Sequence, residues 1–327
     1  MIAVTGGGGF LGSAIVRQLR ARGEAVRAVQ RRPAPALLAL GAEVAQCDIA
    51  DLGALKAAIA GCSAVIHVAA KAGVWGSYAS YYTANVVGTQ NVVAACRALQ
   101  IAKLVYTSTP SVIHTGGDVA GVDESVPLAS HFAAAYPATK AIAEQLVLAA
   151  NGPELATVAL RPHLIWGPND AQLTARVVAR ARAGRLRLVG SGEKLIDSTY
   201  IDNAAAAHIM ALDRVAPGAA CAGRAYFITQ GEPMPQKQLI NGILQAAGLP
   251  PCDKSISPRL AYFVGMVMES LWFLLRRRDE PLMTRFVAQQ LATAHWYDIS
   301  AARRDLGYVA HVSVAEGLRL LAKALQN

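Results

Sequence analysis

A short apolar strand at the start of the chain runs directly into a cluster of glycines. Gly6, Gly9 and Gly12 follow residues 2–5 at three-residue spacing, and residues 11–22 then form an amphipathic helical pattern. In such a unit the first glycine permits a tight turn, the second lets a pyrophosphate approach the backbone, and the third lets the helix pack on the strand. Free N–H groups at the helix N-terminus bind phosphate oxygens. The pattern predicts a dinucleotide-binding loop with contacts from Gly6, Gly9, Phe10, Leu11 and Gly12.

Short apolar runs alternate with helical patterns along the first half of the chain. This alternation favours right-handed βαβ crossovers and an α/β fold with a doubly wound parallel sheet. After about Pro168 helical patterns dominate and Pro and Gly become denser. We therefore expect a Rossmann domain over 1–167 and a smaller, mostly helical substrate-binding region over 168–327, of which about 199–213 returns to the first domain. The expected strands are 2–5, 25–30, 43–47, 64–68, 103–107 and 156–161, and the expected helices are 11–22, 52–60, 81–99 and 136–150.

The composition excludes several classes of protein. Of 327 residues, 54% are hydrophobic and 16% are charged, so the chain can bury a large core. A net charge of +9 is compatible with nucleic acid, a membrane surface or anionic ligands. The basic residues are dispersed and no nucleic-acid motif is present, so we predict no nucleic-acid partner. The five cysteines are scattered without a CxxC pair and no secretory signal is visible, which predicts a cytoplasmic protein without a metal site.

The end of the second expected strand bears on the choice of dinucleotide. A site selective for NAD places Asp or Glu there to bind the ribose 2′-hydroxyl, whereas this chain has Gln30, Arg31 and Arg32. Guanidinium groups suit a 2′-phosphate, so we predict NADP(H) over NAD(H), although the two arginines could equally be a solvated pair. Asp48 and Ile49 follow the third strand and could hold the adenine, or Asp48 could cap the next helix.

A tyrosine and a lysine four residues apart indicate the chemistry. Tyr136 and Lys140 lie on one face at the start of an expected helix. A nearby ammonium favours the phenolate and lowers the pKa of the phenol, so Tyr136 can exchange a proton with a carbonyl oxygen while hydride moves. Thr107, Ser108 and Thr109 end a central strand and supply hydroxyls that could hold the substrate oxygen.

Together these motifs carry a resemblance that extends over nearly the whole chain. The set resembles the extended short-chain dehydrogenase/reductase superfamily, in its 3β-hydroxysteroid dehydrogenase-like branch. The resemblance implies that the catalytic hydroxyl falls on Thr109, with Ser108 as the alternative, and that the protein is a homodimer through the helices 81–99 and 136–150. The motifs are 5–12 (TGGGGFLG), 67–70 (HVAA), 85–89 (NVVGT), 106–109 (YTST), Tyr136 with Lys140, 160–168 (LRPHLIWGP), 199–203 (TYIDN) and 306–308 (LGY).

Two segments are similar to a narrower family. Residues 69–78 (AAKAGVWGSY) and 106–112 (YTSTPSV) resemble the 2-alkyl-3-oxoalkanoate reductases of bacterial long-chain olefin biosynthesis. This resemblance implies NADPH-dependent reduction of the C3 ketone of a hydrophobic, long-chain 2-alkyl-3-oxoalkanoic acid to the 3-hydroxy acid. The alternatives are a 3β-hydroxysteroid or dihydroflavonol-type dehydrogenase, then a nucleotide-sugar epimerase or dehydratase, then a non-catalytic NADP-binding sensor.

The remaining candidate contacts lie at strand ends and in the loops that follow them. Lys71 could pair with a phosphate or the substrate carboxylate, or it could be solvated. Asn85 could steady Lys140 through a water, and we expect His67 and His208 to be packed rather than catalytic. Further cofactor contacts are expected from Ala69, Ala70, Lys71, Asn85, Thr107, Ser108, Tyr136, Lys140, Pro162 and Ile165, and substrate contacts from Trp75, Tyr78, Ser111, His163 and Trp166.

The segment 260–278 combines apolar and positively charged residues. Residues 260–275 are rich in aromatic residues, Met and Leu, and three arginines follow at once. The apolar part is shorter than the ~20 residues that span a bilayer. It could instead lie on a membrane surface, face lipid, or be an ordinary buried or dimer helix. We expect it to be the place of any peripheral membrane or partner-enzyme contact.

Overall fold

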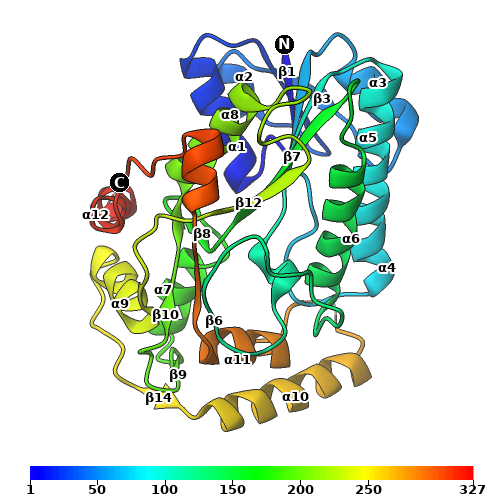
Figure 1. The fold of residues 1–327 in the computed structure, drawn as a ribbon. Helices are drawn as coiled ribbons and strands as arrows, with labels where there is room; N and C mark the ends of the chain where they lie inside the picture. Colours follow the sequence, from blue (N-terminus) through cyan, green and yellow to red (C-terminus); the bar gives the residue numbers. More distant parts are fainter. Residues whose placement is uncertain (278, 327) are drawn as a thin grey trace.

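A seven-stranded parallel sheet forms the centre of the protein (Figure 1). The computed structural model describes residues 1–277 and 279–326. The sheet order is β12-β7-β5-β4-β1-β2-β3, so the direction of winding reverses between β1 and β4. Ligands of doubly wound folds bind at this reversal, outside the carboxyl ends of the strands. The strands are β1 (Ile2–Thr5), β2 (Val26–Gln30), β3 (Glu43–Gln46), β4 (Ala64–His67), β5 (Lys103–Thr107), β7 (Ala156–Pro162) and β12 (Arg224–Ile228).

Helices cover both faces of this sheet and enclose two apolar cores. On one face α1 packs against α8, and the ion pairs Arg17–Asp202 and Arg22–Asp213 join the two helices at 2.7 and 2.9 Å. On the other face α5 lies between α3 and α6. Strands buried on both faces read as nearly continuous apolar runs, which is the pattern of β4 and β7. The helices are α1 (Phe10–Ala21), α2 (Pro35–Ala39), α3 (Leu52–Ile59), α5 (Gly88–Ala98), α6 (Ala135–Ala149) and α8 (Ile201–Arg214).

The expected strands and helices of the first half are confirmed, most of them to within a residue. The helix expected over 81–99 differs, because it begins earlier and is not regular. Ser77 caps α4 (Tyr78–Tyr81) by accepting from the Ser80 N–H, and a π-helical segment, η1 (Tyr82–Val87), joins α4 to α5. Such wide turns concentrate at functional sites, and this one contains Asn85.

The second half of the chain contributes more to the central sheet than the sequence indicated. The helix α8 packs against α1 on one face of this sheet, and β12 pairs with β7 in parallel. The pairing joins Arg224 to Val158 and Ile228 to Pro162, and the prediction did not include it. The segment 224–228 (RAYFI) gave no sign of its partner strand. The division of the chain at 167 stays a prediction.

The rest of the second half is mostly helical, with short strands. One four-stranded sheet has the order β13-β10-β15-β6, so β6 from the first half pairs with a late strand. Two further pairs join β8 to β11 and β9 to β14. The helices are α7 (Thr174–Arg182), α9 (Gln236–Ala246), α10 (Pro258–Leu274), α11 (Arg285–Ala292) and α12 (Val314–Gln326). The strands are β6 (Val119–Val122), β8 (Ile165–Trp166), β9 (Leu188–Val189), β10 (Leu195–Ile196), β11 (Thr199–Tyr200), β13 (Met234–Pro235), β14 (Ser255–Ile256) and β15 (His295–Tyr297), and the short helical turns are η2 (Pro110–Ile113) and η3 (Ala302–Leu306).

The helix α10 lies along the outside of the molecule beneath α11 (Figure 1). Only Ala261 and Gly265 of this helix are buried. Phe273 and Leu274 are 80% and 77% exposed, and Leu260, Phe263 and Leu271 are also exposed. Among the described residues no helix has the length and apolar character to cross a membrane. Arg278, at the end of the expected 260–278 segment, lies outside the described residues.

Candidate active site

The glycine loop leaves room that side chains would fill. Gly6 has φ +68°, and a Cβ added there would lie 2.9 Å from the Ala69 backbone. A Cβ at Gly12 would lie 2.1 Å from the Gly6 carbonyl oxygen, so α1 could not pack on β1 with any larger residue. Gly9 is the N-cap of α1 and supplies no capping side chain. The first N–H groups of α1 are therefore open to a phosphate, and the loop fits a dinucleotide.

The end of β2 carries the residues expected at the adenosine ribose. The Oε1 of Gln30 is buried without a partner among the described residues and faces Gly8, and its Nε2 donates to the Arg32 carbonyl at 2.7 Å. Arg31 and Arg32 are exposed, and neither forms an ion pair within the described part of the chain. Asp48 is exposed after β3 and accepts from the Ala50 N–H at 3.0 Å.

One alternative for Asp48 is wrong. The next helix, α3, is capped by Asp51, whose side chain accepts from the Ala54 N–H at 3.0 Å. Asp48 lies three residues earlier and closes a turn instead, so it does not cap the helix. Ile49 beside it is buried, and Asn91 donates to its carbonyl at 2.9 Å.

Tyr136 and Lys140 lie in the first turns of α6, on one face of the helix. Lys140 is buried, and its Nζ donates to the Thr107 carbonyl oxygen while lying 4.2 Å from the centre of the Tyr106 ring. Burial lowers the pKa of Lys140 to about 7, and Glu144 opposes the shift. The strand β5 thus fixes the ammonium at the carboxyl edge of the sheet.

The phenol of Tyr136 does not have the lowered pKa that the sequence suggested. Burial raises the pKa of Tyr136 to about 12, while a hydrogen bond with the Thr109 side chain lowers it. Lys140 does not lower it in the chain alone, because its ammonium is engaged at Thr107. At neutral pH the phenol is therefore protonated and suited to act as an acid.

The two candidate catalytic hydroxyls have different surroundings. Thr109 follows β5, accepts from the Ser111 N–H at 3.3 Å and contacts Tyr136. The Oγ of Ser108 is buried without a partner among the described residues, and its backbone N–H donates to the Leu160 carbonyl. The contact with Tyr136 favours Thr109 as the hydroxyl that shares the substrate oxygen.

The loop after β4 is tied to the π-helical segment. The Oδ1 of Asn85 accepts from the Lys71 N–H at 2.7 Å, and its Nδ2 donates to the Lys71 carbonyl and to Thr139 Oγ1. Asn85 therefore shapes the loop directly and reaches the residue before Lys140. The Nζ of Lys71 donates to Ser80 Oγ at 2.6 Å and lies 4.6 Å from the centre of the Tyr81 ring. The partly buried Ala69 donates to Thr5 Oγ1, and Ala70 is exposed.

Two histidines are packed, as expected. His67 bridges Thr5 Oγ1 and Thr89 Oγ1 at 2.7 and 3.0 Å, and burial lowers its pKa to about 3. His208 pairs with Thr107 Oγ1 at 2.8 Å, and burial lowers its pKa to about 4. Both imidazoles are neutral and hold the strands in place.

The structure contradicts Trp166 as a substrate contact. Its side chain is fully buried, its Nε1 donates to Ser198 Oγ at 3.0 Å, and its ring packs edge-on against Tyr200. Successive side chains of β8 face opposite sides, and Trp166 faces the core while Ile165 stays half-buried. Pro162 is buried at the end of β7, while Ile165 is half-buried in β8.

His163 lies in a buried cluster of imidazoles rather than on an open surface. Its ring centre is 5.8 Å from that of His295, which is 4.9 Å from that of His114. Both ring nitrogens of His114 and of His163 lack partners among the described residues. The next residue, Leu164, has φ +40°, a strained conformation of the kind that concentrates at functional sites.

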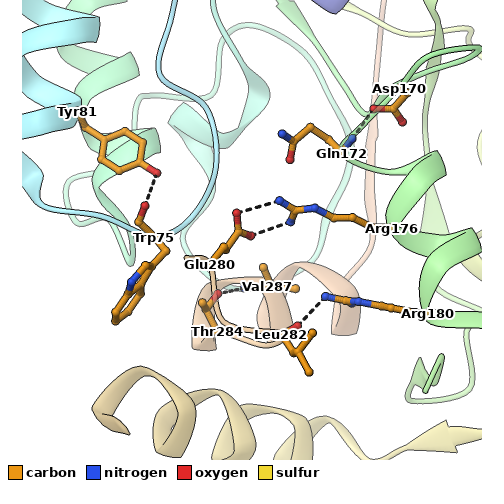
Figure 2. A network of polar contacts seen from close by, with 10 residues as sticks. All are labelled: Trp75, Tyr81, Asp170, Gln172, Arg176, Arg180, Glu280, Leu282, Thr284 and Val287. Atoms are coloured by element: carbon orange, nitrogen blue, oxygen red, sulfur yellow. Dashed lines mark hydrogen bonds and ion pairs between the residues drawn. The ribbon is translucent and has the colours of Figure 1, made fainter. Parts of the chain in front are cut away.

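The other expected substrate residues lie at the rim. Tyr78 is 51% exposed and stacks near Tyr82. Trp75 is half-buried, and its carbonyl accepts from the Tyr81 hydroxyl at 3.2 Å (Figure 2). Ser111 is half-buried beside Thr109.

A cavity of about 500 Å³ opens between the glycine loop and the segment after β8. Gly8, Gly9 and Phe10 line one side, and Asp170 and Gln172 line the other. Asp170 is buried and accepts from three successive backbone N–H groups at 172–174, which fixes this wall. No site was predicted at this wall from the sequence, although the Gly-Pro-Asn-Asp turn at 167–170 marks a loop at the carboxyl edge.

This fold and these side chains define an oxidoreductase of the extended short-chain dehydrogenase/reductase class, with a site for a nicotinamide dinucleotide. Residues 3–257 match the 3-beta hydroxysteroid dehydrogenase/isomerase family, and the chain belongs to that family. 

Individual relatives agree with this class. The chain is 58% identical over 323 residues to a 2-alkyl-3-oxoalkanoate reductase of Stenotrophomonas maltophilia (strain K279a), covering 98% of each chain. It is 50% identical over 330 residues to a protein of the same name from Shewanella oneidensis (strain MR-1), covering 98% of this chain and 85% of that one. The solved structure of MoeE5 in complex with UDP-glucuronic acid and NAD is similar with a TM-score of 0.76 and 25% identity, covering 99% and 98% of the two chains.

Proposed function

We propose that this protein reduces the C3 ketone of a hydrophobic 2-alkyl-3-oxoalkanoic acid to the 3-hydroxy acid, using NADPH. The observation that carries the proposal is the placement of Tyr136 and Lys140 on one face of α6, with Thr109 beside Tyr136 at the carboxyl edge of β5. The relatives named 2-alkyl-3-oxoalkanoate reductase support the choice of substrate.

The side chains would divide the reaction as follows. The hydride for the ketone carbon would come from a reduced nicotinamide held at this edge of the sheet. Thr109 donates a hydrogen bond to the ketone oxygen, and Tyr136 gives its phenolic proton to that oxygen as negative charge develops there. Lys140, fixed by Thr107, binds the cofactor ribose. Its pKa of about 7 lets the ammonium lose a proton at low cost when Tyr136 is reprotonated.

Several residues would hold the cofactor. The glycine loop and the N-terminus of α1 take the pyrophosphate, and Asp48 and Ile49 take the adenine. Arg31 and Arg32 take the 2′-phosphate, which favours NADP(H) over NAD(H). Further contacts would come from Ala69, Ala70, Lys71, Asn85, Thr107, Ser108, Pro162 and Ile165. The absence of an acid at the end of β2 supports the preference for NADP(H).

A panel of substrates tests the proposal against its family alternatives. NADPH oxidation is measured with a racemic 2-alkyl-3-oxo acid and with a 3-ketosteroid at equal concentrations, and conversion of a UDP-sugar is followed by chromatography of the products, because epimerisation or dehydration consumes no NADPH. We expect the highest kcat/KM with the oxo acid. Preference for the steroid would make this chain a hydroxysteroid dehydrogenase, and turnover of the UDP-sugar alone would contradict the proposal.

The surroundings of the enzyme are also part of the proposal. The five free cysteines suit a cytoplasmic protein. The family resemblance supports a homodimer through the helices over 81–99 and 136–150. The exposed apolar side chains of α10 would contact a membrane surface or a partner enzyme that handles the same lipid. Sedimentation with anionic vesicles, compared between the native chain and F273S/L274S, tests the membrane contact. Equal sedimentation of the two proteins would reject it.

A further inference from the structure

An arginine of α7 is paired with a glutamate from a distant part of the chain. Arg176 on α7 binds Glu280 through two parallel bonds of 2.7 and 2.9 Å (Figure 2). Glu280 belongs to the segment that joins α10 to α11, here called the strap (residues 279–284). The pair is partly open to solvent, with side chains 39% and 23% exposed. It is therefore accessible to a competing ligand.

The pair lies beside the catalytic machinery. A Cβ added at Gly73 would lie 3.4 Å from Glu280 Oε2 and 3.5 Å from the Tyr81 hydroxyl oxygen, so both atoms face the same glycine. Tyr81 is in turn close enough to Tyr136 to raise the pKa of its phenol. Arg176 also lies four residues after Gln172, which precedes α7 and lines the cavity next to the glycine loop.

The chemistry of this position suits a carboxylate ligand. A guanidinium presents a planar pair of donors that matches a carboxylate, and Glu280 already occupies it in this manner. The substrate under the proposed function carries a carboxylate on the carbon next to the ketone. Binding of that acid would exchange one carboxylate for another at Arg176. The guanidinium of Arg176 would therefore stay paired with a carboxylate throughout.

We propose that Arg176 binds the carboxylate of the substrate and that Glu280 occupies its place in the free enzyme. Substrate binding then releases Glu280 and loosens the strap. A second arginine on α7 distinguishes binding of the substrate carboxylate from holding of the strap. Arg180 also holds the strap, but it donates to the carbonyl oxygen of Leu282 at 2.7 Å, a neutral contact (Figure 2). The assignment of Arg176 rests on the proposed substrate class.

The experiment compares three variants of the NADPH-loaded enzyme. With the 2-alkyl-3-oxo acid, Arg176→Gln should raise KM about 10- to 100-fold, the range for losing a charged hydrogen bond, with a much smaller change in kcat. Glu280→Gln should lower KM, because it removes the internal competitor. Arg180→Gln should leave KM within about 3-fold of the native value, because it affects only the strap. The KM of Arg176→Lys should lie between those of the native enzyme and Arg176→Gln. Lysine keeps the positive charge but lacks the planar pair of guanidinium donors.

Two ligands test the carboxylate site separately from the proposed reaction. One lacks the carboxylate and the other lacks the ketone. A long-chain ketone that lacks the carboxylate should show the same KM with native enzyme and Arg176→Gln. A 2-alkylalkanoic acid that lacks the ketone should bind the NADP⁺-loaded native enzyme, and its Kd should rise in Arg176→Gln. If that acid binds in this manner while the oxo acid is not reduced, the carboxylate site stands and the proposed reaction fails.

Three results would overturn the proposal. Equal increases of KM in Arg176→Gln and Arg180→Gln would mean that Arg176 acts only by holding the strap. An increase of KM in Glu280→Gln would show that the ion pair supports the site rather than competing for it. An equal loss with the neutral ketone would show that Arg176 does not bind the carboxylate. Thermal unfolding of each variant checks that it is folded.

Discussion

Tyr136 is half-buried, and its phenol stays protonated at neutral pH because desolvation of the hydroxyl raises its pKa to about 12. As the proton donor for the reduced ketone it should be difficult to replace. Tyr136→Phe is expected to lower kcat by at least ~10²-fold, since the general acid is lost. Its KM for NADPH should change little, because the phenol is not expected to hold the phosphates. Steady-state NADPH oxidation measures both, and a fully active variant would remove Tyr136 from the mechanism.

Arg31 and Arg32 are exposed at the end of β2, where a 2′-phosphate would lie. Replacing both with Ala should raise KM for NADPH about 10-fold or more, since charge-assisted bonds to the phosphate are lost. KM for NADH should stay unchanged, because NADH has no phosphate there. The ratio of kcat/KM for the two dinucleotides measures the effect. An unchanged ratio would show that the arginines are a solvated pair.

The sequence predicted correctly where the candidate site residues lie in the fold when their place depends on backbone position alone. The glycine spacing and the four-residue spacing of Tyr136 and Lys140 place these groups at strand ends and on one helix face. It failed at Trp166, because successive residues of a strand face opposite sides and the sequence does not show which side of β8 is buried. Arg176 and Glu280 are 104 residues apart, so no local pattern could pair them.

Among the helices, α10 depends on a close approach to the segment before α11. A Cβ added at Gly265 would lie 2.6 Å from the Thr284 carbonyl carbon. Gly265→Ala should therefore lower the free energy of unfolding by about 1–3 kcal/mol, the range for overpacking. Urea denaturation measures the change.

A second helical glycine provides the control for this substitution. In α3 the nearest atom to a Cβ at Gly53 is Asp51 Oδ1 at 3.4 Å, an ordinary contact. Gly53→Ala should raise the free energy of unfolding by up to about 1 kcal/mol through helix propensity. Destabilisation of both variants to the same degree would mean that the contact with Thr284 is not the cause.

The elements themselves were largely predictable, because apolar periodicity is local. The π-helical segment at 82–87 was not, since it is fixed by the contacts of Asn85 with Lys71 and Thr139. The helix over 260–275 was expected as a helix, and its exposure is a tertiary property. Its apolar sequence is equally compatible with burial.

At the scale of the whole molecule, folding requires several histidines to be neutral. Burial lowers the pKa values of His67, His163 and His295 to about 3 and that of His208 to about 4. In the unfolded chain these pKa values return to about 6.5, so the unfolded state binds more protons below that pH. The histidines therefore stabilise the fold above pH 6.5, and this stability is lost as the pH falls toward 3. Asp197 opposes them, because burial raises its pKa to about 6.

The free energy of unfolding should thus fall steeply between pH 6.5 and 5. Near pH 5 the net release of about three protons on folding corresponds to a slope of at most about 4 kcal/mol per pH unit. Urea denaturation of the enzyme without cofactor at successive pH values gives the slope. A flat profile across this range would show that the imidazoles are not desolvated.

The architecture of the whole chain was predictable in its first half and less so in its second. Alternating strands and helices imply the parallel sheet, and the right-handed crossover restricts its order. The return of β12 to the edge beside β7, and of β6 to the smaller sheet, joins segments far apart in sequence. Such pairings depend on which edge stays uncovered after the first half has folded.

Transfer of a label between cofactor and substrate tests the central claim most directly. The enzyme is given a racemic 2-alkyl-3-oxo acid with NADPH that carries deuterium at the transferable position, and the product is examined by mass spectrometry and NMR. We predict a 3-hydroxy acid with one deuterium on C3, formed at the rate at which NADPH is oxidised. NADPH that stays unoxidised in the presence of the acid, or a product without deuterium at C3, would contradict the assignment.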